Sequence, residues 1–222
     1  MTVKTRIALV LGLFAALSGC SSDPNQSALA QQFLNRSKGY DPGADFLAAQ
    51  NSGAPGYVAG LQNGDNAYTV FLRQTVNARG EETWISPDRL SLGMKDGMMI
   101  ATRGFGHDQL AADARETLSA LTSGQNAVTE RFVTLLAAGS TAETLAFRCQ
   151  VTRQKQEPVQ LSDSYTADTD LFYETCRNGQ MAFRNLFWVE RGSRSIVQSR
   201  QWISEETGEL ALRRLAPQAT IP

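Results

Sequence analysis

Apolar and polar positions alternate with a period of two in many stretches after about Tyr57. In residues 144–152, TLAFRCQVT, the apolar positions 145, 147, 149 and 151 alternate with mostly polar ones. Successive side chains of a strand point to opposite faces, so this pattern predicts a half-buried strand. The same interpretation predicts strands at residues 67–76, 82–86, 90–94, 98–102, 169–177, 181–190, 195–204 and 209–216.

Tight turns separate these stretches. Asp96-Gly97 lies between two apolar runs, which is a strong hairpin signal. Residues 191–194 and 205–209 are further turns. Many short strands with tight turns predict a mainly β fold, an antiparallel meander that forms a barrel or a strongly curved sheet. A closed barrel would also remove exposed strand edges.

Helical spacing is confined to a few segments. Residues 108–124 place four apolar side chains on one side and end in a glycine, which predicts one helix inserted in mid-chain. Residues 127–139 alternate poorly, so both a strand and a helix stay open there. Near the start, Asp23-Pro24 is typical of an N-cap and first helical position, followed by a short helix over 25–39. Residues 42–51 suggest a second one.

The amino terminus has the pattern of an exported lipoprotein. Lys4 and Arg6 precede an apolar run over residues 7–17, which is too short to cross a bilayer because spanning takes about twenty residues. The run ends in Leu-Ser-Gly-Cys, which resembles a bacterial lipobox. We therefore expect Cys20 to be acylated, and several acyl chains anchor a protein stably.

These features divide the chain into three parts: a lipoprotein signal peptide (1–19), a lipid anchor with a short tether and helical segment (20–56), and a barrel-like periplasmic domain (57–222). Ser21, in place of aspartate, implies an outer-membrane location that faces the periplasm. Removal of 1–19 takes away two basic residues, so 21 basic and 22 acidic residues become 19 and 22. Such a chain has no excess of basic residues of the kind that binds nucleic acid.

With Cys20 acylated, Cys149 and Cys176 remain. Two cysteines in an oxidising compartment favour a disulfide. Zinc binding is the competing use, but two sulfurs and one histidine are a thin ligand set. We therefore predict a Cys149–Cys176 disulfide, and expect no metal and no cofactor.

Two longer segments resemble a known family: WISPDRLSLGMKDGMMIATRGFGHDQLAAD (residues 84–113) and FRNLFWVERGSRSIVQSRQWISEETGELALRRL (residues 183–215). Together they are similar to the YjbF-type lipoproteins, whose relatives serve exopolysaccharide and group 4 capsule production. The resemblance covers roughly residues 40–216, and the lipobox fits it. It implies a mostly β, barrel-like periplasmic fold and a role in polysaccharide export or assembly. It supplies no catalytic residue.

His107, the chain's one histidine, precedes Asp108. A catalytic triad needs a serine or cysteine beside the histidine and an acid behind it. Adjacent residues point in different directions, so Asp108 is badly placed to orient His107. We assign no catalytic residue. Instead we predict that Asp108 is the N-cap of the following helix, and that His107 packs or hydrogen-bonds at the turn.

Arg200, Gln201 and Trp202 are candidate binding residues, together with His107. Inside a barrel, Arg200 and Gln201 would bind sugar hydroxyls or a uronate carboxylate, whereas outside they form a solvated strand face, which we favour. The tryptophans Trp84, Trp188 and Trp202 are candidates for stacking on sugar rings. Tryptophans in strands are more often core anchors, so we predict that role.

Two classes of function fit these observations. The preferred hypothesis is a non-enzymatic accessory of exopolysaccharide or capsule secretion. Its partners would be outer-membrane lipid through the acyl chains, a secretion protein of the outer membrane or periplasm, and the polysaccharide itself. The alternative is a glycan-modifying hydrolase or esterase that uses His107. An envelope scaffold without sugar contact also stays open.

Overall fold

The computed structural model describes residues 53–61, 68–137, 141–162 and 164–215. Internal contacts divide the chain into two units, Met1–Asp41 and Pro42–Pro222, and every described residue belongs to the second. The predicted signal peptide, Cys20 and the two predicted amino-terminal helices lie outside the described residues. Among the helices that are described, none is long and apolar enough to cross a membrane.

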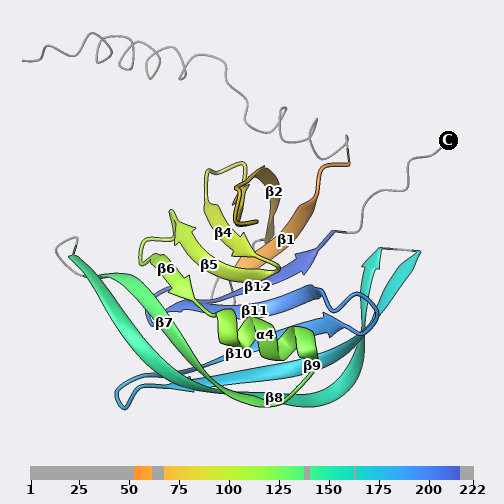
Figure 1. Cartoon of the computed structure of the whole chain (residues 1–222). Coiled ribbons are helices and arrows are strands. Elements are labelled where there is room, and N and C mark those ends of the chain that lie inside the picture. The colour runs from red at the N-terminus through yellow and green to blue at the C-terminus, as the bar shows by residue number, and fades with distance from the viewer. Residues whose placement is uncertain (1–52, 62–67, 138–140, 163, 216–222) are drawn as a thin grey trace, which may run out of the picture. The chain divides into compact units, whose positions relative to one another are not determined.

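The described part of the chain consists of twelve strands and one helix (Figure 1). In chain order they are β1 (Gly56–Leu61), β2 (Tyr68–Val76), β3 (Glu82–Ile85), β4 (Ser91–Lys95), β5 (Met98–Arg103), β6 (Gln109–Asp113), α4 (Arg115–Ser123), β7 (Ala127–Ala137), β8 (Thr141–Ser162), β9 (Tyr165–Arg177), β10 (Ala182–Glu190), β11 (Ile196–Ser204) and β12 (Gly208–Arg214). Each strand predicted from alternation is present, although β8 is much longer than predicted. The ambiguous segment 127–139 is a strand, β7.

The strands form one twelve-stranded antiparallel sheet in the order β5-β4-β3-β2-β1-β12-β11-β10-β9-β8-β7-β6. All neighbours are consecutive in the chain except β1 and β12, whose pairing joins the first and last strands in the middle of the sheet. The sheet curves into a nearly closed, barrel-shaped body (Figure 1). The predicted fold class, a mainly β antiparallel meander with a helix inserted in mid-chain, is therefore confirmed.

The two edge strands, β5 and β6, meet through side chains rather than through a strand ladder in the described sheet. Thr102 Oγ1 of β5 donates to Asp108 Oδ1 at 2.8 Å and accepts from the backbone N–H of Gln109 in β6 at 2.9 Å. The side-chain amide of Gln109 is buried without a hydrogen-bond partner among the described residues. The sheet is therefore nearly closed in shape, but in the described sheet no backbone ladder joins β5 to β6.

The inner face of the sheet carries the core because every second side chain along a strand points inward. One group of buried residues lies under β1–β5 and the ends of β11 and β12, a second surrounds α4, and a third lies around β8, β9 and β10. Gly97, at the turn between β4 and β5, has φ 85°, and a Cβ there would lie 2.7 Å from Ile196 Cβ. Only glycine therefore lets this turn pack on the start of β11.

The helix is shorter than predicted. α4 begins at Arg115, not at residue 109, and the preceding residues form β6. The prediction that Asp108 caps it is wrong, because the N-cap position is Ala114, which makes no side-chain cap hydrogen bond. The carboxylate of Asp108 instead accepts from the backbone N–H groups of Gly104 and Phe105, at 2.9 and 3.2 Å. Figure 1 shows α4 on the concave side of the sheet, over β7–β10.

Candidate functional site

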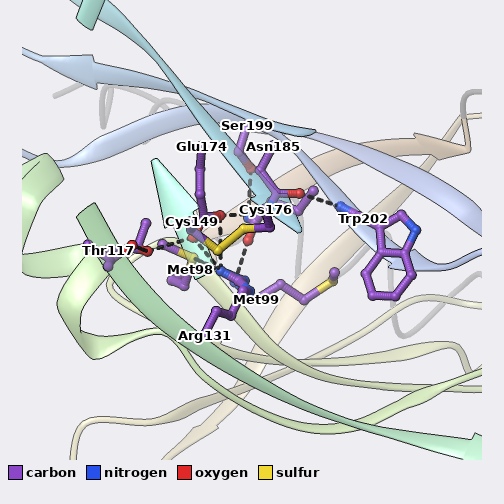
Figure 2. Close-up of polar contacts among 12 residues, drawn as sticks. Met98, Met99, Thr117, Arg131, Cys149, Glu174, Cys176, Asn185, Ser199 and Trp202 are labelled. Carbon is purple, nitrogen blue, oxygen red and sulfur yellow. Dashed lines mark hydrogen bonds and ion pairs between the residues drawn. A yellow bond between two sulfur atoms is a disulfide. The ribbon is translucent and has the colours of Figure 1, made fainter. Parts of the chain in front are cut away.

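A buried ion pair occupies the inside of the sheet between β7 and β9 (Figure 2). Arg131 Nη1 lies 3.2 Å from Glu174 Oε2, and the two side chains are 2% and 0% exposed. Glu174 also accepts hydrogen bonds from Thr117 of α4 and Asn185 of β10, at 2.5 and 2.6 Å. The carboxylate is thus held from three elements, as a buried charge requires. Protein groups, not a ligand, satisfy it.

The structure joins Cys149 and Cys176, which are direct register partners on β8 and β9. Their sulfurs and the Glu174 carboxylate lie within 4.8 Å of one another, a spacing that also suits a metal ion. Two features oppose metal binding here. A disulfide offers no thiolate ligand, and the guanidinium of Arg131 already neutralises Glu174. We assign this cluster a structural role.

Gln201, a predicted candidate, is completely buried on the inner face. Its Oε1 accepts from the backbone N–H of Met99 at 2.9 Å, and its Nε2 donates to the carbonyl of Gly97 at 3.1 Å. These are backbone groups of the edge strand β5 and its turn. The prediction of a solvated strand face is wrong for Gln201, because β5 folds back over the inside of β11 and needs a hydrogen-bonding partner there.

The three tryptophans have different roles. Trp84 is 3% exposed and Trp202 7% exposed, so both are core residues. Trp202 stacks on Phe183 with ring centroids 4.4 Å apart, and a bulge in β11 lets it face the core beside Ile203. Trp188 is half-buried on the opposite face of the sheet, where solvent reaches it.

His107 lies in the exposed loop between β5 and β6. Its side chain is 58% exposed, and its Nδ1 is 3.9 Å from Glu206 Oε2. The hydroxyl of Thr207 donates to the backbone carbonyl of His107, not to the imidazole. Asp108 is turned away into its own loop. In the described structure, no serine or cysteine hydrogen-bonds the imidazole, so the residues flagged here do not form a nucleophilic triad.

Arg200 lines a groove on the outer face of the sheet, across β1, β12, β11 and β10. The cavity volume is about 420 Å³. In the strand register, Arg213 lies opposite Val58 and Gln198, and Gln198 lies opposite Trp188. The next row consists of Gly60, Ala211 and Arg200. Because Gly60 and Ala211 are small, the groove is deepest at this row, and the larger side chains surround it. We call this the outer-face groove.

Trp188 is held rigidly at one wall of the outer-face groove. Its Nε1 donates to Glu157 Oε2 of β8 at 3.0 Å. The indole also packs against an apolar cluster formed by the far ends of β8 and β9, together with the bulged residue Val197. We call residues 155–162 and 164–170 the β8–β9 arm. A ring fixed by packing and by a hydrogen bond presents its surface at little cost in conformational entropy.

The polar side chains of the groove keep free hydrogen-bonding capacity. Arg213 Nε donates to Gln198 Oε1 at 2.6 Å, and among the described residues the terminal guanidinium nitrogens of Arg213 and the amide nitrogen of Gln198 form no side-chain hydrogen bond. Arg200 Nε lies 3.7 Å from Glu209 Oε2, and the Arg200 side chain is 38% exposed. A fixed aromatic ring with a few planar donors is the composition of a small-molecule or glycan site.

Part of this groove was predictable from the sequence. Arg200 was a candidate binding residue and Trp188 a candidate for stacking, although the core role was predicted for Trp188, and Gln198 and Arg213 were not among the candidates. Alternation places Gln198 and Arg200 on one face, and that signal was available. The depth of the groove depends on Gly60 and Ala211 being neighbours of Arg200 across strands, and the β1–β12 pairing that sets this cannot be read from local pattern.

Fold and site together define a class: a β-rich protein with a filled interior and a polar groove on its outer face. Residues 47–215 match the family described as group 4 capsule polysaccharide lipoprotein gfcB, YjbF, and the chain belongs to this family. The resemblance predicted from the two segments is confirmed. A search of curated protein sequences finds no match.

Among solved structures, the crystal structure of the hypothetical lipoprotein YmcC from Escherichia coli (K12) is similar to this chain, with a TM-score of 0.65. The match covers 90% of this chain and 100% of that chain, at 14% sequence identity. At this identity the likeness concerns the fold, and it agrees with the curved twelve-stranded sheet described above.

Proposed function

We propose that this chain is anchored to the periplasmic face of the outer membrane through acyl groups on Cys20. In this proposal it acts as a non-enzymatic accessory of capsule or exopolysaccharide secretion, and holds the polysaccharide in the outer-face groove. Membership of a capsule polysaccharide lipoprotein family supports the pathway. The lipobox that ends at Cys20 supports the anchor.

The observation that carries glycan binding is the fixed Trp188 beside Arg200, Arg213 and Gln198. A sugar ring has an apolar face that packs on an aromatic ring and a rim of hydroxyls that needs planar donors and acceptors. The outer-face groove supplies both, on neighbouring strands of a rigid sheet. It lies open on the sheet surface, so a polymer chain crosses it without having to thread through a closed pore.

The surroundings of His107 support a non-enzymatic role over a hydrolase or esterase. The imidazole is exposed, and its Nδ1 lies 3.9 Å from the carboxylate of Glu206. A serine or cysteine hydrolase that used His107 as its base would need a hydroxyl or thiol within hydrogen-bonding reach of the imidazole. The hydroxyl of Thr207 donates to the backbone carbonyl of His107 instead.

The test is to measure binding of the exported polysaccharide to the purified full chain in detergent. Trp188→Leu keeps an apolar side chain against the β8–β9 arm but removes the ring, and should weaken binding about tenfold, or ~1.4 kcal/mol. Arg200→Ala should weaken it to a similar extent. Matched controls are Phe132→Leu and Arg115→Ala, because Phe132 is 41% exposed on β7 and the Arg115 side chain is 88% exposed on α4.

Control variants should bind like the unmodified protein, and thermal melting should show that all four variants fold. The proposal fails if the unmodified chain does not bind the polysaccharide. It also fails if the groove variants and the control variants bind equally well.

A further inference from the structure

A second, larger cavity lies at one end of the sheet, where it is bordered by the start of β1 and the end of β12. Its volume is about 810 Å³. Residues of β2 and β3, the turn between β4 and β5, the turn between β10 and β11, and the last turn of α4 also line it. We call it the end cavity. It shares β1, β11 and β12 with the outer-face groove, but different residues of these strands line the two.

The end cavity is lined by more basic than acidic side chains. Arg73 is paired with Glu82 at 2.8 Å, and Asp96 lies 3.5 Å from Lys95. Two further arginines line the cavity, Arg194 and Arg214. Neither forms an ion pair within 4 Å in the part of the chain that the structure describes. The lining therefore carries three arginines against two acidic residues, an excess of one positive charge.

Glu190 is an acid that interacts electrostatically with Arg214, and its carboxylate already accepts two hydrogen bonds. It accepts hydrogen bonds from the hydroxyls of Ser193 and Tyr165. These two bonds hold its pKa below the usual range, and the positive charge of Arg214 acts in the same direction. Glu190 thus interacts with Arg214 at longer range without forming an ion pair with it.

Arg194 is held against the carboxyl end of α4. It sits in the turn after β10 with φ 59°. A Cβ added at Gly124, the C-cap of α4, would lie 2.7 Å from Arg194 Nη1 and 3.2 Å from its Cζ. The last turn of α4 has no basic residue of its own, so Arg194 supplies the cation that a helix C-terminus favours. A glycine at position 124 makes room for it.

The hydroxyl of Tyr57 is a neutral hydrogen-bond donor in the end cavity. The residue is 6% exposed and lines the end cavity, with its ring packed edge-to-face on Trp84 at 4.7 Å. Its hydroxyl forms no hydrogen bond with another described residue, although a buried hydroxyl normally has one. Electrostatic interactions with Arg214, Arg73, Glu82 and Asp96 place the hydroxyl among the charged groups of the cavity.

We propose that the end cavity binds the anionic group of an acidic sugar residue, with Arg194 and Arg214 as its charge partners and the Tyr57 hydroxyl as a donor. A guanidinium binds a carboxylate through two parallel hydrogen bonds, and both arginines line this one cavity. A cavity of this size accepts a ligand of one or two rings. The inference rests on the proposed function, because it specifies an acidic polysaccharide as the class of glycan.

The experiment is calorimetric titration of the purified full chain with glucuronate, with glucose as the neutral match and with inorganic phosphate as a second anion. Arg194→Gln and Arg214→Gln remove the charges and keep polar side chains that can still form hydrogen bonds. Arg115→Gln removes an exposed arginine outside the end cavity and serves as the control. Tyr57→Phe removes only the hydroxyl. Melting curves check that each variant folds.

Glucuronate should bind, glucose should bind at least tenfold more weakly, and each arginine variant should lose about tenfold or more in affinity for glucuronate. Phosphate that binds as tightly as glucuronate and depends on both arginines would overturn the assignment to an acidic sugar. Unchanged glucuronate binding in Arg194→Gln and Arg214→Gln would overturn the site itself.

Variants of the outer-face groove and of the end cavity together distinguish the two proposals. If Trp188→Leu weakens polysaccharide binding while the arginine variants leave glucuronate binding unchanged, the proposed function stands and the end cavity is not an acid site. If glucuronate binding depends on Arg194 and Arg214 but the polysaccharide does not bind the full chain, the proposed function fails. The end cavity is then a site for a small acidic sugar, and its assignment to a polysaccharide falls.

Discussion

The side-chain oxygen of Gln201 accepts a hydrogen bond from the backbone N–H of Met99, 102 positions earlier in the chain, at 2.9 Å. The amide nitrogen of the same side chain donates to the carbonyl of Gly97. One glutamine thereby satisfies a donor of the edge strand β5 and an acceptor of the turn before it. This contact holds the first half of the sheet against the inner side of the second half.

Gln201→Leu should therefore be strongly destabilising. The substitution keeps the volume but leaves two buried backbone groups without partners, at a cost of about 1–3 kcal/mol each. Urea denaturation would measure the free energy of unfolding. Gln154→Leu is the matched control, because Gln154 is exposed and, among the described residues, its side chain hydrogen-bonds only Thr152. Equal unfolding midpoints for the two variants would contradict the role of Gln201.

Gln109→Leu should have the opposite outcome at an equally buried position. Both side-chain polar atoms of Gln109 are buried, with no partner among the described residues. An apolar side chain of similar shape removes two buried polar atoms that lack a hydrogen-bond partner, so the free energy of unfolding should stay the same or rise by about 1–2 kcal/mol. If Gln109→Leu lowers stability as much as Gln201→Leu, ordered water satisfies the Gln109 amide.

The Arg131–Glu174 pair predicts strongly non-additive stability effects. Arg131→Met leaves a buried carboxylate without its cation, which should cost about 3–5 kcal/mol. Adding Glu174→Leu removes the buried, unpaired carboxylate, so the double variant should be more stable than Arg131→Met alone. A double-mutant cycle by chemical denaturation measures this. Additive losses from the two substitutions would show that the groups act independently.

Breaking the Cys149–Cys176 bond should lower stability without changing the fold. The two residues are 27 positions apart, so the chain-entropy model predicts a loss of about 3–4 kcal/mol for Cys149→Ser with Cys176→Ser. Thermal melting of the double variant, and of the unmodified protein with and without reductant, would measure the effect. A melting temperature unaffected by both treatments would contradict it.

Stability should fall in alkaline solution because of Tyr57. Burial raises the pKa of Tyr57 to about 12, and the negative charge of Glu82 acts in the same direction. The folded state therefore holds this proton more tightly than the unfolded state. The resulting stabilisation is complete below pH 10 and is lost as the pH rises toward 12.

Tyr57→Phe keeps the ring but cannot ionise. Its free energy of unfolding should therefore fall less between pH 10 and 12 than that of the unmodified protein, by about 2–3 kcal/mol at 1.36 kcal/mol per pKa unit. Urea denaturation at several pH values compares the two. Parallel curves for the two proteins would show that Tyr57 does not have this pKa.

The strands were predictable because their alternation is local. Phe147, Cys149 and Val151 point inward from β8 as their spacing requires. The pairing of β1 with β12 joins residues some 150 positions apart, so no local pattern reveals it. Since this pairing brings Gly60 and Ala211 beside Arg200, the outer-face groove was predictable only in part.

Two predictions were wrong for chemical reasons. Asp108 has the side chain of an N-cap, but the same carboxylate caps a loop when backbone N–H groups turn toward it, as those of Gly104 and Phe105 do. Gln201 was assigned to solvent because a polar side chain on a strand is usually exposed. A sheet that folds over its own edge creates buried backbone groups, and these require a polar partner inside.

Polysaccharide export in living cells tests the central claim most directly. A strain that lacks the gene is complemented with the unmodified chain, with Cys20→Ala, with the double variant Trp188→Leu and Arg200→Ala, or with the control pair Phe132→Leu and Arg115→Ala. The account predicts that the unmodified chain and the control pair restore exported polysaccharide, while the other two do not. Full export with the double groove variant, present at normal levels in the outer membrane, would contradict it.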